Sequence, residues 1–574
     1  MSFYAIDFAR TSAQSRELGT LSDSVRVDVR RFTTFFGDPS GPPADLSGDV
    51  LVFGHVRLDE EVELASELGC RGARGLELVA RTYAAFAEGF ERRLFGDFAI
   101  VIVDRERRVV MAVRDPFGVR PLVYRRAGDV LSFARDPIAL AASSADLDAD
   151  AVAEFLGGAN SSRERTMFRE VSRLPPGHLL RATATSTVVK RHWRPEPVEV
   201  EGSASEINER FRALFFSAVG ARATGNRPVI AHASGGLDSS AIAAVAARLM
   251  PPADLRLAHA HFREADELSW VRALEKHVGR AIAIVDAVPT STIDDALDPS
   301  HPFRYPLAAG ANGIAALATS AGARVVLSGI GGDEVTFERG VFRDLAAHRR
   351  WIALLRETIF ADHYSTRSGR FFFRDALVAQ VPKRARALRR RLRARPKDDR
   401  PWARAERGAP TEPEPRVFAS HTQEATWQWV TSGALSATLE LEERAWRRAG
   451  LELRVPFLDR RLVEHVLALP FMSRLPHGRM KAIVRDALSD VLPRAVRERT
   501  TVTTYDRAVR AAIRAKKAEI RAVFEEGPWR SEPFADRTSA RDAFRSIDDE
   551  TCDIDRLTGL WDAATLELWL RARA

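Results

Sequence analysis

The sequence is poor in cysteine, with only Cys70 and Cys552 among 574 residues. Two cysteines exclude a disulfide framework and a thiolate zinc site, and they favour a reducing compartment. The sequence also lacks any run of about 18 apolar residues, so no membrane span is expected. Its first residues have no basic region followed by an apolar core, so no secretory signal is expected. We therefore expect a cytoplasmic protein.

An excess of basic residues is the main feature of the charge distribution. Lysine and arginine number 86 against 78 acidic residues, giving a formal net charge of +8. Much of the excess lies at residues 383–395, where eight of thirteen residues are basic. No nucleic-acid-binding motif accompanies them, so nucleic acid is not an expected partner. This segment is either a solvated basic stretch or a docking surface for an acidic peptide or partner protein.

The length of the chain indicates several domains. Its 574 residues exceed the roughly 250–300 at which a single core stops growing. Residues 195–205 contain two prolines, acidic residues, glycine and serine, a composition typical of a linker. We therefore place one domain at 1–195 and a second at 203–574, with a basic insertion at about 340–420.

The first domain is predicted to be rich in strands. A helix is expected over residues 73–94, because Val79, Tyr83, Phe86 and Phe90 share one helical face. Apolar runs at hairpin spacing predict strands at 49–55, 97–104, 109–114, 121–124 and 130–134.

The second domain is predicted to contain a parallel sheet. It begins with a helix that we expect Ser205 to cap. The apolar face of that helix comprises Ile207, Phe211, Leu214, Phe215 and Ala218. Strands are predicted at 229–233, 255–261, 281–285 and 324–327, separated by helical stretches. Such alternation favours a parallel α/β sheet, which binds ligands at the carboxyl ends of its strands.

A glycine-containing turn follows the first of these strands. Its sequence is Ser234-Gly235-Gly236-Leu237-Asp238-Ser239-Ser240, and an Ala-rich helix follows with Asp238 and Ser239 in its cap region. Glycines let the backbone approach a ligand, and the free N–H groups of a helix start favour an anion. The lysine of the common P-loop is missing, but Asp238 could hold a Mg²⁺ ion that bridges phosphates. The alternative is an ordinary strand-turn-helix connection.

A second turn of the same kind follows the last predicted strand. It runs Ser328-Gly329-Ile330-Gly331-Gly332 and continues into Asp333. Two glycine turns at strand ends, each followed by an aspartate, predict facing loops that bind the triphosphate of ATP, with Mg²⁺ held by Asp238 and Asp333. Alternatively, the acids only stabilise helix N-termini.

Three groups of motifs resemble the class B asparagine synthetases. Residues 96–99, 113–118 and 120–124 resemble the glutaminase half of that family. The two glycine turns resemble its synthetase half and the pyrophosphate loop of N-type ATP pyrophosphatases. Residues 450–459, Gly-Leu-Glu-Leu-Arg-Val-Pro-Phe-Leu-Asp, are close to the superfamily's signature. The resemblance implies an N-terminal Ntn-hydrolase-like αββα sandwich, a C-terminal adenine-nucleotide α-hydrolase-like α/β domain, and cleavage of ATP to AMP and pyrophosphate.

The resemblance also suggests roles for four residues. Glu452 matches a glutamate that takes a proton from the attacking amine, although a salt bridge to Arg454 or a neighbour is the alternative. Lys481 matches a lysine that approaches phosphate, or it is a lysine on a helix surface. Relatives carry another lysine at the place of Thr501, where Arg497 or Arg499 could substitute for it.

One departure from the family concerns its glutaminase. The family uses an N-terminal cysteine as nucleophile, whereas Ser2 follows Met1 here. A hydroxyl is far less acidic than a thiol, so we expect the first domain to keep its fold and to have lost ammonia production. A serine-based amidohydrolase is the alternative. β-Lactam synthetases carry a tyrosine at the place of Ile330, and isoleucine cannot relay protons.

These features together resemble lasso-peptide macrolactam cyclases, as do residues 56–59 and 63–64. The resemblance implies that a precursor peptide's Asp or Glu side chain is adenylated and then attacked by the peptide's own N-terminal amine. It also implies a leader-binding protein and a leader peptidase as partners. The alternatives are an asparagine synthetase that uses ammonia, a β-lactam synthetase-like amide ligase, and a non-catalytic binding module.

Overall fold

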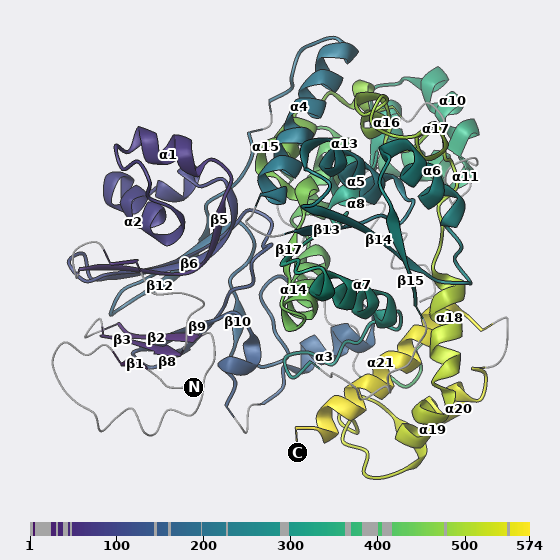
Figure 1. The fold of residues 1–574 in the computed structure, drawn as a ribbon. Coiled ribbons are helices and arrows are strands. Elements are labelled where there is room, and N and C mark those ends of the chain that lie inside the picture. The colour runs from purple at the N-terminus through teal and green to yellow at the C-terminus, as the bar shows by residue number, and fades with distance from the viewer. Residues whose placement is uncertain are drawn as a thin grey trace.

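Three β-sheets organise the described part of the chain (Figure 1). Two are antiparallel and lie in the N-terminal third, and the third is parallel. The computed structural model describes residues 4–5, 24–29, 33–37, 44–45, 49–142, 146–158, 162–196, 198–224, 228–287, 298–361, 369–381, 400–404, 416–475, 479–547 and 552–573. Ser2 and the basic segment 383–395 lie outside these residues.

The two antiparallel sheets stack on each other. Their strands are β1 (Tyr4–Ala5), β2 (Ser24–Asp28), β3 (Thr33–Gly37), β4 (Ala44–Asp45), β5 (Val50–Leu58), β6 (Gly96–Asp104), β7 (Val109–Arg114), β8 (Val123–Ala127), β9 (Val130–Ala134), β10 (Ser172–Arg173), β11 (His178–Ala182) and β12 (Thr187–Arg191). One sheet has the order β1-β3-β2-β9-β8-β10 and the other β12-β11-β7-β6-β5-β4. The five strands predicted here are confirmed, with boundaries shifted by a few residues.

Side-chain alternation along β6 builds two cores. Val101 and Val103 point into the space between the sheets, where they pack with Phe53 and Phe133. Ile100 and its alternate neighbours face the other way, towards α1 (Glu61–Glu67) and α2 (Gly75–Phe86). Figure 1 shows these helices on the outer face of the β5–β6 sheet. The described residues of the N-terminal part thus form three stacked layers, with a helical layer on one sheet and that sheet on the other.

The predicted helix over residues 73–94 is wrong in its extent. Helix α2 ends at Phe86, because Ala87 and Gly89 both have positive φ angles, 48° and 101°. A 3₁₀ turn over Phe90–Arg93 follows. Phe90 still packs edge-on against Tyr83, with ring centroids 5.4 Å apart. The predicted contact between these apolar side chains is therefore present, but Phe90 reaches it from a 3₁₀ turn and not from a continuous helix.

The second half begins with α4 (Ala204–Ala223). Ser203, not the predicted Ser205, is its N-cap, and Ser203 forms a capping box with Glu206. The reason is the spacing, because only Ser203 has a glutamate three residues later. Ile207, Phe211, Phe215 and Ala218 are buried as expected, whereas Leu214 is half-buried.

The parallel sheet has the strand order β15-β14-β13-β16-β17. Its strands are β13 (Val229–His232), β14 (Leu255–His261), β15 (Ile282–Asp286), β16 (Val325–Leu327) and β17 (Glu452–Arg454). The four predicted strands are confirmed, and the signature block supplies the fifth. The chain moves from β13 outward to β15 and then returns to the other side of β13. This reversal brings the loops that follow β13 and β16 together at the carboxyl edge.

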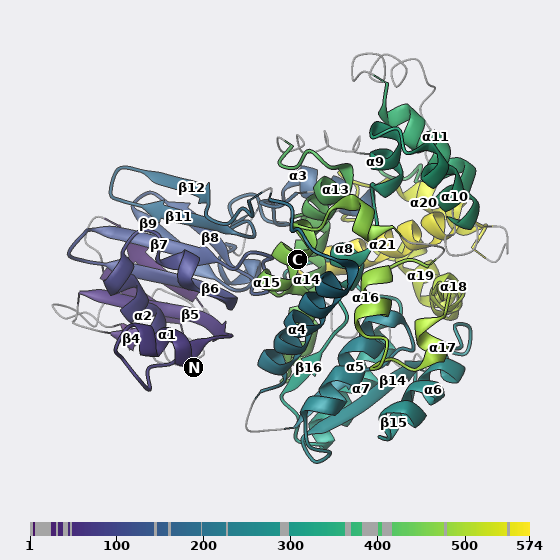
Figure 2. The same cartoon turned by 90° about the horizontal axis from the view of Figure 1, so that it is seen from above.

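Helices surround this sheet and extend beyond it (Figure 2). They are α5 (Leu237–Leu249), α6 (Leu268–Val278), α7 (Ala308–Ser320), α8 (Gly332–Thr336), α9 (Val341–Ala347), α10 (Trp351–Ala361), α11 (Gly369–Ala379), α13 (His421–Val430), α14 (Gly433–Arg448), α15 (Arg460–Leu467), α16 (Ala482–Ala487) and α17 (Arg494–Arg497). Among the described residues, none of the helices is long and apolar enough to cross a membrane.

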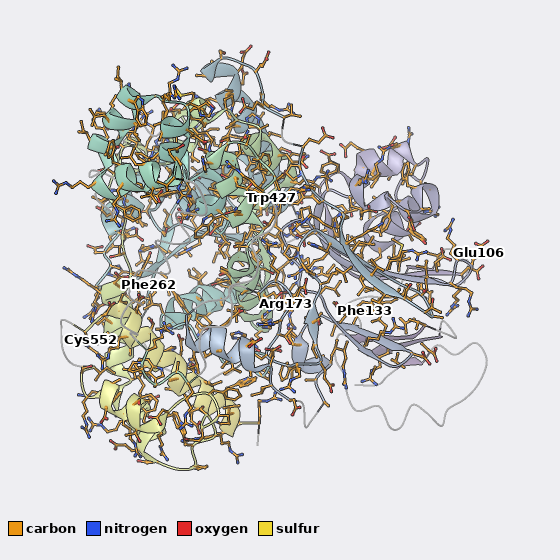
Figure 3. All side chains as sticks on the ribbon, turned by 180° about the vertical axis from the view of Figure 1, so that it is seen from behind. Glu106, Phe133, Arg173, Phe262, Trp427 and Cys552 are labelled. Carbon is orange, nitrogen blue, oxygen red and sulfur yellow. The ribbon has the colours of Figure 1, made fainter. Side chains whose placement is uncertain are left out.

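The last helices form a separate core with the N-terminal half. They are α18 (Asp506–Ala515), α19 (Lys517–Glu525), α20 (Arg537–Phe544) and α21 (Ile554–Arg571), and they pack on α3 (Ala149–Leu156). Phe155 and Leu156 of α3 share this core with Trp561 and Trp569. Figure 3 shows Cys552 in the same C-terminal region. The C-terminal helices therefore contact the N-terminal half through α3.

Buried ion pairs join the two halves. Arg222 of α4 is 1% exposed and donates to Asp97 of β6 at 3.1 Å and to Asp459 at 3.0 Å. A second pair links Arg173, which Figure 3 places at the boundary between the halves, to Glu440 of α14 at 2.8 Å. Arg173 and Arg114 outweigh burial and lower the pKa of Glu440 to about 2. Charged contacts thus fix how the two halves sit together.

Replacing Arg222 should be costly. Arg222→Ala removes the cation that Asp97 and Asp459 share and leaves each with one arginine, Arg57 and Arg461. The free energy of unfolding should therefore fall by about 3 kcal/mol, the lower end of the cost of breaking a buried pair, measured by urea unfolding at neutral pH. Although burial opposes it, Arg222 lowers the pKa of both Asp97 and Asp459. The pair's contribution is therefore present above the usual carboxyl range and is lost as pH falls, so the gap between wild type and variant should narrow below about pH 5.

Arg212 on the same helix provides the control. It pairs with Asp490 on the surface, so Arg212→Ala should change stability by less than about 1 kcal/mol. Equal costs for the two variants, or a gap that widens in acid, would contradict the role given to Arg222.

Candidate active site

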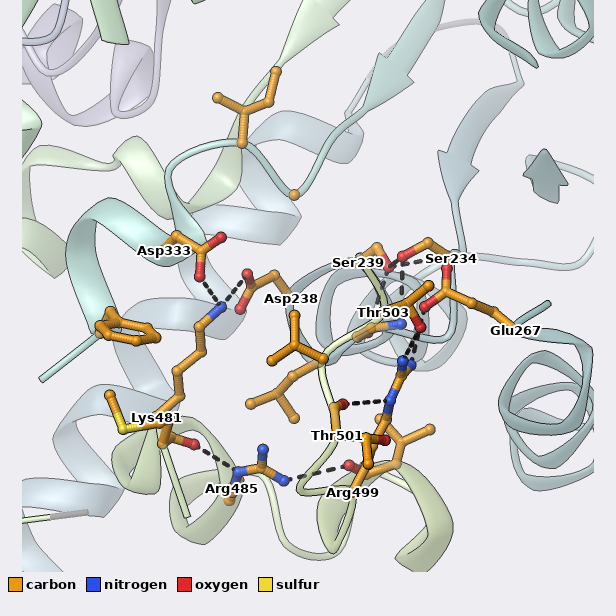
Figure 4. Close-up of a pocket in the computed structure, with 18 of the residues that line it drawn as sticks. Ser234, Asp238, Ser239, Glu267, Asp333, Lys481, Arg485, Arg499, Thr501 and Thr503 are labelled. Carbon is orange, nitrogen blue, oxygen red and sulfur yellow. Dashed lines mark hydrogen bonds and ion pairs between the residues drawn. The ribbon is translucent and has the colours of Figure 1, made fainter. Parts of the chain in front are cut away.

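A cavity of about 580 Å³ opens at the carboxyl edge of the parallel sheet (Figure 4). The loops after β13 and β16 form one wall, and residues 480–505 form the other. The predicted residues that line it are Ser234, Gly236, Leu237, Asp238, Ser239, Ser328, Gly329, Ile330, Asp333, Lys481 and Arg499. The other predicted residues, Gly235, Ser240, Gly331, Gly332, Glu452 and Arg497, are not part of its lining.

The first loop leads directly into α5. This helix starts at Leu237 with Gly236 as its N-cap, so Asp238 and Ser239 lie in the first turn and not in the cap as predicted. The hydroxyls of Ser234 and Ser239 lie 2.8 Å apart, and Ser239 also accepts the N–H of Ser234. Gly235 has a φ of 75°, and a Cβ there would lie 3.0 Å from that of Trp270. Helix α5 therefore starts two residues earlier than expected, because Gly235 and Gly236 complete the turn before Leu237.

The second loop touches the first. A Cβ on Gly332 would lie 2.3 Å from Cγ of Asp238, and a Cβ on Gly329 would lie 3.2 Å from the backbone nitrogen of Ser239. Only glycine permits such an approach. The two loops are thus brought into contact within one wall, and Asp238 and Asp333 project into one space (Figure 4).

One ammonium group occupies the space between these aspartates. Nζ of Lys481 lies 2.5 Å from Oδ2 of Asp238 and 2.8 Å from Oδ1 of Asp333. Burial disfavours the charged lysine, but the two carboxylates raise its pKa. The other oxygen of Asp238 is buried and has no hydrogen-bond partner among the described residues. The contact between the two loops therefore stabilises a cation, and Oδ1 of Asp238 remains as a buried acceptor without a hydrogen bond from the described residues.

The backbone of Lys481 is held in an uncommon conformation. Its φ of 62° is in the left-handed region, which a non-glycine residue adopts at a cost. The carboxylate of Glu338 accepts the N–H groups of Lys481 and Ala482, each at 2.8 Å. Glu338 is 3% exposed and thereby fixes the start of α16. The lysine is consequently positioned by the fold and does not lie on a helix surface.

Arg499 forms the opposite wall of the cavity. It donates to the carbonyl oxygen of Gly235 at 2.9 Å and to Glu267 at 3.0 Å, and it stacks on the Trp270 ring at 3.8 Å. Tyr505 donates to the other oxygen of Glu267 at 2.6 Å. Arg499 thus holds the first loop in shape. Arg497 points elsewhere and donates to the carbonyl oxygen of Ser489, while Thr501 lines the cavity.

Glu452 lies at the contact between the two halves. Its carboxylate pairs with Arg120 of the N-terminal half and with Arg454 at 2.8 Å. Although burial opposes it, Arg120 and Arg454 lower the pKa of Glu452. Arg454 in turn donates to the carbonyl oxygen of Arg222 at 2.9 Å. The salt bridge to Arg454 is therefore present, and Glu452 is ionised.

Three charged residues of the cavity were missed by the sequence analysis. Arg339 stacks on the ring of Trp429 at 3.7 Å, and burial lowers the pKa of Arg485 to about 10. The third is Glu267. Arg485 stands four residues after Lys481, one helical turn along, and this spacing was an available signal. Glu267 and Arg339 carry no motif, so no local signal marks them.

Comparisons with known proteins agree with this architecture. The model of the asparagine synthase family matches residues 210–571, and that of a glutamine amidotransferase domain matches residues 47–193. The glutamine-hydrolyzing asparagine synthetase 3 of Bacillus subtilis is 24% identical over 483 residues, covering 75% of this chain and 71% of the relative. A putative glutamine-hydrolyzing asparagine synthetase of Mycobacterium tuberculosis is 24% identical and covers 92% and 85%.

The chain is also similar to a fungal protein that is named an amidase. The amidase chyE of Penicillium rubens is 28% identical over 297 residues, which cover 47% of this chain and 44% of the relative. The fold class expected from the sequence is confirmed, namely an Ntn-type N-terminal domain followed by an α/β domain with a parallel sheet. Since the family match spans well over half of its length, the chain belongs to the asparagine synthase family of ATP-dependent amide ligases.

Proposed function

We propose that this family member is an AMP-forming macrolactam cyclase. A side-chain carboxylate of a precursor peptide attacks the α-phosphate of the substrate ATP and releases pyrophosphate. The peptide's N-terminal amine then attacks the acyl adenylate, forms the amide bond and releases AMP. A leader-binding protein and a leader peptidase would deliver the trimmed peptide, and the domain at 1–195 would serve as an inactive support for the domain at 203–574.

The two facing loops support the ATP part of the proposal. The first turn of α5 offers backbone N–H groups, and Asp238 and Asp333 converge on one cation position. Mg²⁺ is usually held in proteins by one or two carboxylates together with substrate phosphates, so this donor set fits the ion. Bound there, Mg²⁺ would neutralise charge on the departing pyrophosphate. Lys481 would then exchange its carboxylate partners for a phosphate oxygen.

The rim of the cavity is the observation that carries the choice of a peptide. Residues 500–504 have no regular secondary structure, they are uncharged, and Val502 is 68% exposed. Ile330 and Phe337 add apolar surface to the lining. A free amino acid needs charged partners for both its α-ammonium and its α-carboxylate. The uncharged stretch 500–504 suits a peptide chain that lies along it and presents only a side-chain carboxylate to the charged residues deeper in the cavity.

The position of the cysteines supports an amine that does not come from glutamine. Cys70 is half-buried just after α1, and Cys552 is buried among the C-terminal helices. Both are internal residues, so neither can pair its thiol with its own free α-amino group as the family's glutaminase nucleophile does. An amine carried by the substrate removes the need for a thiol nucleophile, and Glu452, held ionised, would accept the proton that this amine must lose.

The products test the proposal directly. With ATP, Mg²⁺ and a precursor peptide, the enzyme should release AMP and pyrophosphate in equal amounts, and the peptide should lose the mass of one water. Chromatography and mass spectrometry measure both, and EDTA should stop the reaction. Turnover of aspartate with ammonium ions, without peptide turnover, would instead identify an asparagine synthetase. Release of ADP and phosphate would contradict adenylation.

Gly332→Ala should disable the cation position. The new Cβ would overlap the carboxylate of Asp238, so exchange of labelled pyrophosphate into ATP should fall on the order of 10²-fold. Gly220→Ala is the matched control, since its Cβ would meet only Leu249 at 3.6 Å inside α4. Full exchange activity in Gly332→Ala would show that the loops do not hold the nucleotide in this way.

Glu452→Gln should separate the two half-reactions. Adenylation needs no proton transfer from the amine, so pyrophosphate exchange should persist, while product formation should fall by about 10²–10⁴-fold. Glu440→Gln is the control, because Glu440 also pairs with two arginines between the halves. It should lower stability without a selective loss of product. A joint loss of exchange and product in Glu452→Gln would restrict Glu452 to a structural role.

A further inference from the structure

Four lysine and arginine side chains line the cavity, and two of them are paired with carboxylates. Nζ of Lys481 lies between Asp238 and Asp333, and Arg499 pairs with Glu267 at 3.0 Å (Figure 4). Among the described residues, these three acids are also the carboxylates that line the cavity. The two remaining cationic side chains therefore have no acid of the lining left to pair with.

Arg485 is the third cation, and backbone carbonyl groups hold it. Its side chain is 7% exposed and donates to the carbonyl oxygens of Met480, at 2.7 Å, and of Arg497. The bond to Arg497 ties α16 to α17, and Figure 4 shows the guanidinium spanning this part of the wall. Arg485 is therefore engaged in holding the wall of the cavity together.

Arg339 is the fourth cation, and no described carboxylate forms an ion pair with it. It is half-buried, and its Nη1 donates to the carbonyl oxygen of Asp333 at 2.9 Å. Burial lowers the pKa of Arg339, and the carboxylates of Asp333 and Glu334 oppose this shift without reaching ion-pair distance. Partly burying a cation without a paired anion is costly, which points to an anionic ligand.

Two aromatic rings fix the plane of this guanidinium. Cζ of Arg339 lies 3.7 Å from the ring centroid of Trp429 and 4.9 Å from that of Phe337. A guanidinium that stacks on a ring by its face keeps N–H groups at its edge, and a pair of these groups matches the two oxygens of a carboxylate. The stacking therefore prepares Arg339 for a planar, bidentate ligand.

The backbone on both sides of Arg339 is anchored. The carboxylate of Glu338 accepts the N–H of Lys481 at 2.8 Å. Gly340 has a φ of 90°, and a Cβ there would lie 2.4 Å from the carbonyl oxygen of His421. The side chain of Arg339 thus starts from a fixed point, so little conformational freedom remains to be lost when a ligand binds.

The surroundings of Arg339 favour a carboxylate over a phosphate. Its contacts lie on the second loop and on α13, whereas the groups suited to phosphates are the first loop, the start of α5 and Lys481. Adenylation needs a carboxylate held beside the α-phosphate, where two anions would otherwise repel each other. A cation at the edge of the phosphate site meets this need.

We propose that Arg339 binds the substrate carboxylate that becomes adenylated. The inference rests on the proposed function, because it supplies a substrate contact for the first step. One carboxylate oxygen forms the bond to the α-phosphorus, and the bond from that phosphorus to the bridging oxygen of the pyrophosphate breaks. Arg339 stays protonated throughout, and Trp429 is a positioning residue that holds the guanidinium plane.

A comparison of an acid peptide with its amide analogue tests this contact. Binding of the precursor peptide is measured by calorimetry with Mg²⁺ and α,β-methylene-ATP, once with its acceptor Asp or Glu and once with Asn or Gln there. Arg339→Gln should weaken binding of the acid peptide by about 10–100-fold, the range for a lost hydrogen bond between charged groups. Binding of the amide peptide should change little, because it offers no charge to the arginine.

Three further variants complete the design. Arg339→Lys keeps the charge but loses the paired donors, so its loss should be smaller than that of Arg339→Gln. Trp429→Leu should also weaken the acid peptide selectively, which a merely structural role would not do. Arg343→Gln is the matched control, since Arg343 pairs with Asp375 on the surface, and both peptides should bind to it as to wild type. Thermal unfolding establishes that each variant is folded.

Several outcomes would overturn the proposal. Equal weakening of the acid and amide peptides in Arg339→Gln would exclude a contact with the carboxylate, and so would unchanged binding of the acid peptide. Weaker binding of the ATP analogue alone would assign Arg339 to a phosphate. If the wild type binds aspartate and not the peptide, the proposed function fails, and the same comparison with aspartate and asparagine then tests Arg339 separately.

Discussion

The guanidinium of Arg222 is the contact on which the arrangement of the two halves depends. It binds Asp97 from the N-terminal sheet and Asp459 from the end of the signature block, so three charges are buried together. Burying them is costly, but each charge is compensated at short range, and the pKa of Arg222 is raised as a result, against the effect of burial. The same residue accepts a hydrogen bond from Arg454, the partner of Glu452. The position of Glu452 is therefore tied to the contact between the halves.

The cavity depends on a second constraint, the close approach of two loops. The strand order places β13 beside β16, which brings both loops to the same edge, and glycines at 329 and 332 let the loops touch. This approach leaves Asp238 and Asp333 about one cation apart, and Lys481 fills the gap. Glu338 offsets the strain of the lysine backbone. The strained backbone of Lys481 therefore places a cation where the two acidic loops meet.

Much of this arrangement was predictable, and the reasons are local. Strand periodicity and glycine turns are short-range features, so the sheet and the two loops followed from the sequence. The interest of Lys481 rested on the family resemblance alone, and its contacts with Asp238 and Asp333 were not predicted. Pairings between distant residues did not. Glu267 and Arg499 are 232 positions apart, and Glu452 and Arg120 are 332 apart. Spacing also failed to distinguish Arg497 from Arg499, because a turn after α17 directs only one of them into the cavity.

The described start of the insertion between the second loop and α13 is anchored at the wall of the cavity. Arg339 lines the cavity and donates to the carbonyl oxygen of Asp333, and α9 begins two residues later. Helix α9 packs against α10 and α11, and Asp344 on α9 accepts hydrogen bonds from the start of α13. These contacts tie the start of α9 both to the wall of the cavity and to α13. The conformation of the loop that carries Asp333 therefore depends on the packing of α9 and α13 as well as on the sheet.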